Sequence, residues 1–116
     1  MLRKIILLLF LFVGIECFSQ TYIRKGAYNY SEIMYNFDKK TKYIRKGPSN
    51  FGSIIYFIDG NFIRIGSTKN GKIKYYIDKP FIREGSSKQG KIIYYFDGKY
   101  IRKGSSKLGE IIFNVK

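Results

Sequence analysis

Hydrophobic and polar residues alternate along most of this chain in a pattern that recurs five times. Each copy begins with an aromatic residue, Ile, Arg, any residue and Gly, passes through a small polar loop, and ends in Ile-x-Tyr-x-apolar-Asp, with local departures. Alternation with a period of two is typical of half-buried strands, and recurrence at a fixed spacing indicates a repeat architecture. The dipeptide Ile-Arg marks the copies, at spacings of 21, 19, 19 and 19 residues: Ile23-Arg24, Ile44-Arg45, Ile63-Arg64, Ile82-Arg83 and Ile101-Arg102.

Each copy predicts two strands, a short one that stops at a glycine and a second one rich in Ile, Tyr and Phe. The turns Asp59-Gly60 and Asp97-Gly98 predict tight hairpins between the second strand of one copy and the first strand of the next. This phase leaves Thr21 to Lys25 and Glu110 to Lys116 without partners unless they pair with each other. We therefore predict an all-β fold class, in which five tandem two-strand repeats close into a pseudo-five-fold ring of β-hairpins without free edges.

The aligned second strands predict which side chains form the core, because alternate residues of a strand share one face of the sheet. The interleaved positions are more polar, and Asn36 and Asn114 among them are expected to face solvent. Three columns are expected inside: Ile33, Ile54, Ile73, Ile92 and Ile111; Tyr35, Tyr56, Tyr75, Tyr94 and Phe113; and Phe37, Ile58, Ile77, Phe96 and Val115.

The first nineteen residues carry a different pattern. Arg3 and Lys4 precede an apolar run from Ile5 to Gly14 that is short for an ordinary transmembrane helix. Cys17 and Ser19 then supply small residues for cleavage before Gln20. We predict a signal peptide over residues 1–19, a five-repeat β domain over residues 20–116, and secretion or retention in the periplasm or cell envelope.

Two other interpretations of this segment stay open. Cys17 could be the acylated cysteine of a lipoprotein, although Glu16 stands where that peptidase prefers a small residue. The segment could also remain uncleaved as an anchor, although nothing after it resembles a stop-transfer sequence. With cleavage after Ser19, the mature chain has no cysteine and must be stabilised by pairing and packing without disulfides.

The chain is strongly basic, with 22 Lys and Arg residues against 8 Asp and Glu, and a net charge of +14. The first nineteen residues hold two of the cations and one of the acids, which leaves +13 on the rest. Such a charge attracts anionic polymers. The dispersed lysines could instead serve solubility and protect strand edges. The partner is unknown from sequence. We expect an anionic cell-surface polymer, a monomer, and no transmembrane span in the mature chain.

The arginines that recur at one repeat position are the candidate site. Five guanidinium groups converging on a ring axis could clamp phosphate, sulfate or carboxylate. Alternatively, each arginine stacks over a neighbouring aromatic residue and pairs with the Asp of a nearby turn, in a purely structural role. The sequence leaves open whether this column faces an axis or the outer rim. The candidate anion-binding residues are Arg24, Arg45, Arg64, Arg83 and Arg102.

We find no constellation that predicts catalysis. The chain has no histidine, and its recurrent aspartates occupy turn positions where Asp is favoured because it bonds local backbone amides. We identify no acid–base, nucleophilic or metal-binding set. We therefore predict neither an enzyme nor a cofactor or metal site.

The repeats as a whole resemble the five-fold beta-flower proteins. The likeness rests on aromatic-Ile-Arg-x-Gly and Ile-x-Tyr-x-x-Asp-Gly units of about nineteen residues, after a leader that ends Phe18-Ser19-Gln20. It covers Thr21 to Lys116. Those proteins are small exported proteins of Gram-negative bacteria of the Bacteroides–Flavobacterium kind. The resemblance implies a pseudo-symmetric ring of β-hairpins, and implies no activity or site residue.

We therefore expect a non-catalytic exported structural or binding module of the bacterial cell envelope, which engages anionic glycans or lipid head groups. The alternative is a charge-driven nucleic-acid-binding protein. A third hypothesis, a small hydrolase of unrecognised type, has no residue set to support it.

Overall fold

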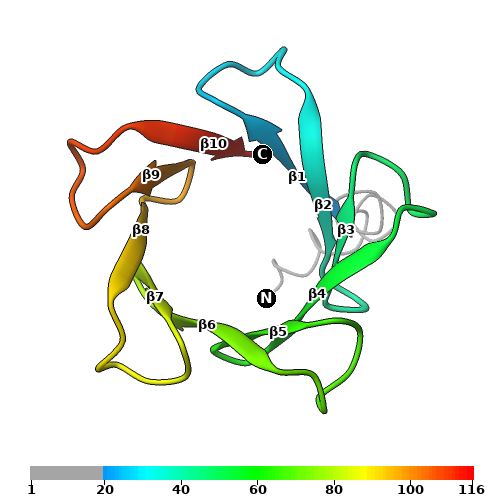
Figure 1. Cartoon of the computed structure of the whole chain (residues 1–116). Coiled ribbons are helices and arrows are strands. Elements are labelled where there is room, and N and C mark those ends of the chain that lie inside the picture. The colour runs from blue at the N-terminus through cyan, green and yellow to red at the C-terminus, as the bar shows by residue number, and fades with distance from the viewer. Residues whose placement is uncertain (1–19) are drawn as a thin grey trace, which may run out of the picture.

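The computed structural model describes residues 20–116, which fold into ten antiparallel β-strands that close into a barrel (Figure 1). The predicted signal peptide lies outside the described residues. No helix is found within residues 20–116. The strands are β1 (Gln20–Lys25), β2 (Ile33–Asp38), β3 (Tyr43–Lys46), β4 (Ile54–Asp59), β5 (Phe62–Ile65), β6 (Ile73–Asp78), β7 (Phe81–Glu84), β8 (Ile92–Phe96), β9 (Tyr100–Lys103) and β10 (Ile111–Val115).

The two ends of the described chain close the barrel. Every strand pairs with its neighbours in sequence, and β1 also pairs with β10, where Ile23 lies opposite Val115. One step further, Tyr22 and Lys116 each donate a backbone N–H to the other's carbonyl, at 2.9 and 3.0 Å. The predicted pairing of the terminal segments is confirmed, and the ring has no free strand edge.

Each odd-numbered strand, its loop and the following even-numbered strand form a unit that we call a petal, numbered 1 to 5 along the chain. Figure 1 shows the petal loops splayed outward from the ring. The turns between petals that contain Asp-Gly are short. Gly60 and Gly98 adopt φ values of 63° and 100° there, as the two Asp-Gly turns require.

A β-bulge in every petal changes which residues face inward. In petal 1, Ile23 pairs with Tyr35 but Arg24 pairs with Ile33, so that Met34 is the extra residue. Cross-strand partners share a face of the sheet, which places Ile33 on the side of the arginine. The same shift occurs in the other petals. The prediction that the Ile33 column faces the core is therefore wrong, because the bulge interrupts the alternation.

The other two predicted columns do face inward. The column that begins with Phe37 pairs with inward-facing isoleucines, as Phe37 does with Ile44. The column that begins with Tyr35 lines the barrel axis, together with the isoleucine of each Ile-Arg dipeptide. That isoleucine column was not predicted, although its alternation with arginine pointed to it.

Candidate functional site

The five candidate arginines lie on the outer wall of the barrel. Each follows an inward-facing isoleucine, so the alternation of the strand turns the arginine outward. The structure therefore does not bring the five guanidinium groups together at the axis. Each Nη1 instead donates to the carbonyl of the residue seven positions on, at the far end of its own loop: Arg24 to Ser31, Arg45 to Gly52, Arg64 to Gly71, Arg83 to Gly90 and Arg102 to Gly109, over 2.9–3.1 Å.

Ion pairs and aromatic rings complete the surroundings of these arginines. Arg64 Nε lies 3.0 Å from Asp59 Oδ2, and its guanidinium carbon lies 5.5 Å from the centre of the Phe62 ring. The pairs Arg83–Asp78 and Arg102–Asp97 repeat this arrangement at 2.9 and 3.6 Å. These contacts match the structural alternative for the arginines. Their role in anion binding stays a prediction.

Two backbone amides hydrogen-bond the carboxylate of Asp97, which lies beside Arg102. The amides of Lys99 and Tyr100 donate to Asp97 Oδ1 at 3.0 and 2.8 Å. The hydrogen bond from Tyr100, followed by that from Lys99, lowers the pKa of the Asp97 carboxyl below its usual value. Burial opposes this effect, and the nearby Arg102 lowers the pKa further. The turn thus keeps a carboxylate beside Arg102.

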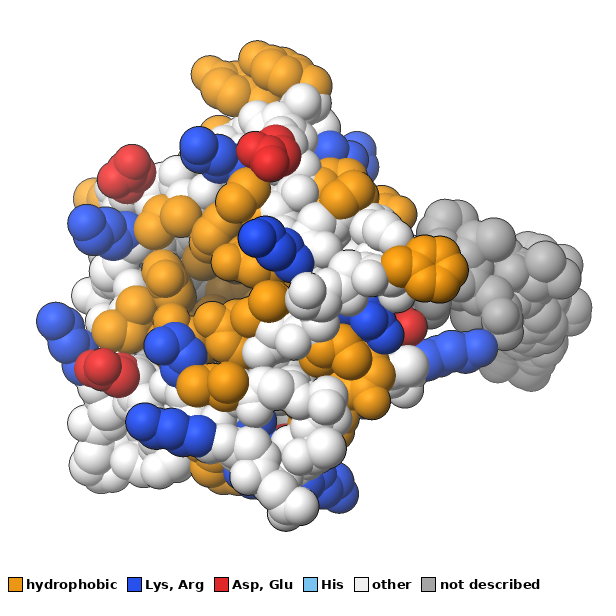
Figure 2. Space-filling view, turned by 45° about the vertical axis from the view of Figure 1, so that its right-hand side comes forward, with side chains coloured by type: hydrophobic (Ala, Val, Ile, Leu, Met, Phe, Trp, Pro, Cys, Tyr) orange, Lys and Arg blue, Asp and Glu red, His pale blue; other side chains and the backbone are white. Residues whose placement is uncertain are grey.

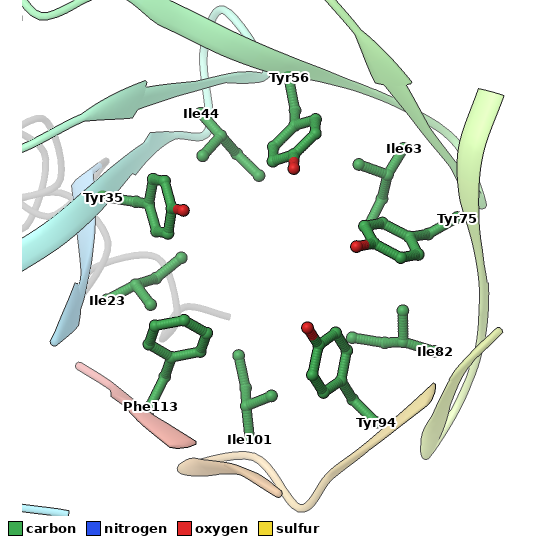
Figure 3. Close-up of a pocket in the computed structure, with 10 residues that line it drawn as sticks. All are labelled: Ile23, Tyr35, Ile44, Tyr56, Ile63, Tyr75, Ile82, Tyr94, Ile101 and Phe113. Atoms are coloured by element: carbon green, nitrogen blue, oxygen red, sulfur yellow. The ribbon is translucent and has the colours of Figure 1, made fainter. Parts of the chain in front are cut away.

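The axis of the barrel holds a cavity of about 100 Å³ with an apolar lining. Figure 3 shows four tyrosines whose hydroxyl groups point toward this axis, with Phe113 at the fifth position of the same layer. Neighbouring rings meet edge to face, with centroids 6.4 Å apart for Tyr56–Tyr75 and 6.2 Å apart for Tyr75–Tyr94. The cavity is lined by Ile23, Tyr35, Ile44, Tyr56, Ile63, Tyr75, Ile82, Tyr94, Ile101 and Phe113.

Burial raises the pKa of Tyr75 from 10.0 to about 12, with further contributions from the neighbouring Tyr94 and Tyr56 and from a hydrogen bond with Tyr94. Burial likewise raises the pKa of Tyr56. Burial thus favours the protonated form of these two hydroxyl groups.

Two asparagines that were expected to face solvent are fully buried, so that prediction is wrong. Asn36 and Asn114 each have 0% exposure. They lie on the outer wall, where the next petal's loop covers them, and each side-chain amide donates twice to that loop. Asn36 bonds the carbonyls of Gly47 and Ser49, at 2.8 and 3.2 Å.

Asn114 makes the corresponding bonds to petal 1, at 2.9 Å to the Gly26 carbonyl and 3.1 Å to the Tyr28 carbonyl. Aromatic residues hold the equivalent position of the other second strands. Phe57, Tyr76 and Tyr95 pack there against the rings of the paired first strands, with centroids 5.8–6.0 Å apart. The break in the aromatic column was the sequence feature that could have identified the two asparagines.

Large hydrophobic side chains stand in solvent at the tips of three petal loops. Tyr28 and Tyr30 in petal 1 are 60% and 83% exposed, Phe51 in petal 2 is 96% exposed, and Leu108 in petal 5 is 95% exposed. Figure 2 shows hydrophobic side chains projecting from the edge of the molecule. Petals 5, 1 and 2 are consecutive around the ring, because β10 pairs with β1. Sequence reasoning missed these tips, since it placed most aromatic residues in the core.

Positive charge covers the outside of the molecule. All fifteen lysines of residues 20–116 are exposed. Arg64, Arg83 and Arg102 form ion pairs with Asp59, Asp78 and Asp97. The exposed lysines give the outer surface its net positive charge.

Within residues 20–116, no three potential metal-ligating side chains lie together. No helix of that segment is long and apolar enough to cross a membrane.

Comparison with known proteins identifies a family for this chain. A family model described as "6-fold beta flower protein" matches residues 19–116, which is the whole chain after its first eighteen residues. No curated protein sequence and no solved structure matches the chain.

Proposed function

The chain belongs to the 6-fold beta flower protein family. From its fold and its surface, we propose that it is a non-catalytic exported module that binds anionic groups of the bacterial cell envelope. The observation that carries the proposal is the exposure of every lysine of residues 20–116 around a closed frame. A net charge of +13 on such a frame concentrates polyanions from solution.

We also infer that this member is built from five repeats, where the family description has six. Five recurrences of Ile-Arg support the count, as do the five bulges and the five arginine-to-loop hydrogen bonds. On this interpretation, removal of residues 1–19 releases a monomeric ring.

Retention on heparin resin, on phosphatidylglycerol vesicles and on double-stranded DNA, each followed against salt, tests the proposed function. We expect the protein to bind the glycan or the lipid more tightly than DNA at matched salt. A variant with Lys69, Lys88 and Lys107 changed to Gln should bind more weakly, and the same lysines changed to Arg should bind as the parent does. If the protein binds none of the three materials at physiological salt, the proposal is refuted.

Nucleic acid is the second candidate, because exposed aromatic residues beside lysines also suit single strands. Tighter binding to DNA, with the steep salt dependence of counterion release, would favour it.

A further inference from the structure

We propose that petals 1 and 2 form a glycan-binding edge, on which the rings of Tyr28, Tyr30 and Phe51 stack against the sugar rings of an anionic polysaccharide. The proposal rests on the proposed function and names the ligand class of that function as glycan.

Two of the aromatic rings of this edge stack on each other although they are exposed. Tyr28 and Tyr30 stack on each other, with centroids 5.2 Å apart and planes 13° apart. The Ser31 amide donates to the Tyr28 carbonyl at 3.2 Å, and the Phe51 amide donates to Ser49 Oγ at 2.9 Å. Large rings are usually removed from water, so an exposed group of them marks a surface that meets a partner.

The buried asparagines hold these two loops and no other petal loop of residues 20–116. Asn114 bonds the backbone of petal 1 at Tyr28, and Asn36 bonds that of petal 2 at Ser49. Phe57, Tyr76 and Tyr95 replace the asparagine in petals 2, 3 and 4, and the loops of petals 3, 4 and 5 each carry a lysine near the tip. The loops with aromatic tips are thus pre-organised, which lowers the entropy lost when a ligand binds.

Amide side chains accompany the rings. Asn29 and Asn50 are exposed beside them, and Gln20 donates to Asn50 Oδ1. Flat rings cover the C–H faces of a sugar while amides bond its hydroxyl groups. The loops 26–31 and 47–53 contain no lysine, so the polymer's anionic groups would meet the lysines elsewhere on the ring.

Other occupants fit this edge less well. A second copy of the chain would bring another +13 charge against it. Insertion into a bilayer would strip water from Asn29 and Asn50 without supplying new partners. A hydrated, acidic sugar polymer satisfies the rings, the amides and the charge together.

The test compares two polyanions, alginate, which has sugar rings, and polyphosphate, which has none. We expect a variant with Tyr28, Tyr30 and Phe51 changed to Ala to bind alginate about tenfold more weakly or worse, a loss of the size seen when rings that stack on nucleic-acid bases are removed. It should bind polyphosphate as the parent does. The matched control, with Lys69, Lys88 and Lys107 changed to Gln, should weaken binding to both polymers. In the parent, alginate oligosaccharides should shift the ring proton resonances of the three aromatic residues.

The outcomes separate this inference from the proposed function. Unchanged alginate binding by the alanine variant overturns the glycan edge and leaves charge-driven binding intact. Equal losses on both polymers overturn it as well, because the rings would then not act on sugars. The alanine variant is also measured on phosphatidylglycerol vesicles. If it loses binding only to these vesicles, the edge contacts a membrane and the glycan assignment is overturned. Failure of the parent to bind either polymer refutes the proposed function itself.

Discussion

Asn114 on the last strand donates its side-chain amide to the carbonyl of Tyr28, at 3.1 Å, across 86 residues of sequence. A second bond from the same amide reaches the Gly26 carbonyl. The side chain is fully buried, so its amide makes both hydrogen bonds without competition from water. This residue therefore joins the closure of the barrel to the conformation of petal 1.

Replacing Asn114 with Ala should lower the free energy of unfolding by about 1–3 kcal/mol, because two hydrogen bonds are lost. Urea denaturation measures this change. The control Asn114→Tyr introduces the residue found at the equivalent Tyr76 and Tyr95, and should keep the fold while amide exchange at Ser31 becomes faster. Unchanged exchange in both variants would show that Asn114 does not fix the loop.

The chain should tolerate relocation of its ends. Tyr22 and Lys116 are bonded across the closure, so a two-residue Asn-Gly turn in place of Gln20-Thr21 can join them. We expect a circular permutant opened between Gly60 and Asn61 to fold with the parent's circular dichroism spectrum. Opening the same permutant in the middle of β6, between Tyr75 and Tyr76, is the control and should prevent folding. A permutant that fails at Gly60 while the linear parent folds would contradict the inferred equivalence of the repeats.

Arg64→Lys should destabilise the protein by about 1–3 kcal/mol, because lysine cannot bond the Gly71 carbonyl, pair with Asp59 and cover the Phe62 ring at once. The exposed Lys69→Gln serves as control and should change stability by no more than about 0.5 kcal/mol. Thermal and urea denaturation provide the comparison. If Arg64→Lys weakens anion binding with no loss of stability, the arginine column acts as a binding site and not as a structural element.

Stability should fall as pH rises from about 10 to about 12. The pKa of Tyr75 is raised to about 12 in the folded state by burial, whereas its ordinary value is 10.0. In that interval the unfolded chain releases this proton first, so alkali favours unfolding, and below the interval the contribution is fully present. Denaturation midpoints measured against pH, with tyrosinate absorbance, should show a smaller fall for Tyr75→Phe. An equal fall in parent and variant would exclude Tyr75 as the cause.

The ring itself could be predicted from sequence because its determinants are local and repeated. Alternation gave the strands, and Asp-Gly gave the hairpin turns. The phase of the repeat then left the two terminal segments as each other's partners. The observed pairing of Ile23 with Val115 follows from these three facts alone.

The bulge could not be predicted in the same way. One extra residue, such as Met34, reverses the facing of Ile33 without altering the hydrophobic pattern that precedes it. The rule of alternating faces therefore failed at the isoleucine before the bulge and held for Tyr35 beyond it.

The candidate site was predictable only in part. The sequence identified the arginines and suggested both an anion-binding role and a structural role for them. Their outward orientation follows from the inward orientation of the isoleucine before each arginine, which the sequence analysis did not predict. Asn36 looked like an ordinary surface residue because its burial is caused by a loop that folds over it from the next petal. This burial depends on tertiary structure. The only sign of it in the sequence is that Asn36 occupies a position where most of the other petals have an aromatic residue.

The loops stand outside the wall, and each is closed at its base by one arginine of its own petal, as Arg64 does at the Gly71 carbonyl. Their outermost residues nevertheless differ from petal to petal: Tyr30, Phe51, Asn70, Gln89 and Leu108. A substitution at one tip alters the chemistry displayed there without disturbing the frame or the remaining tips. Selection can therefore change what this molecule recognises in separate small steps, one petal at a time.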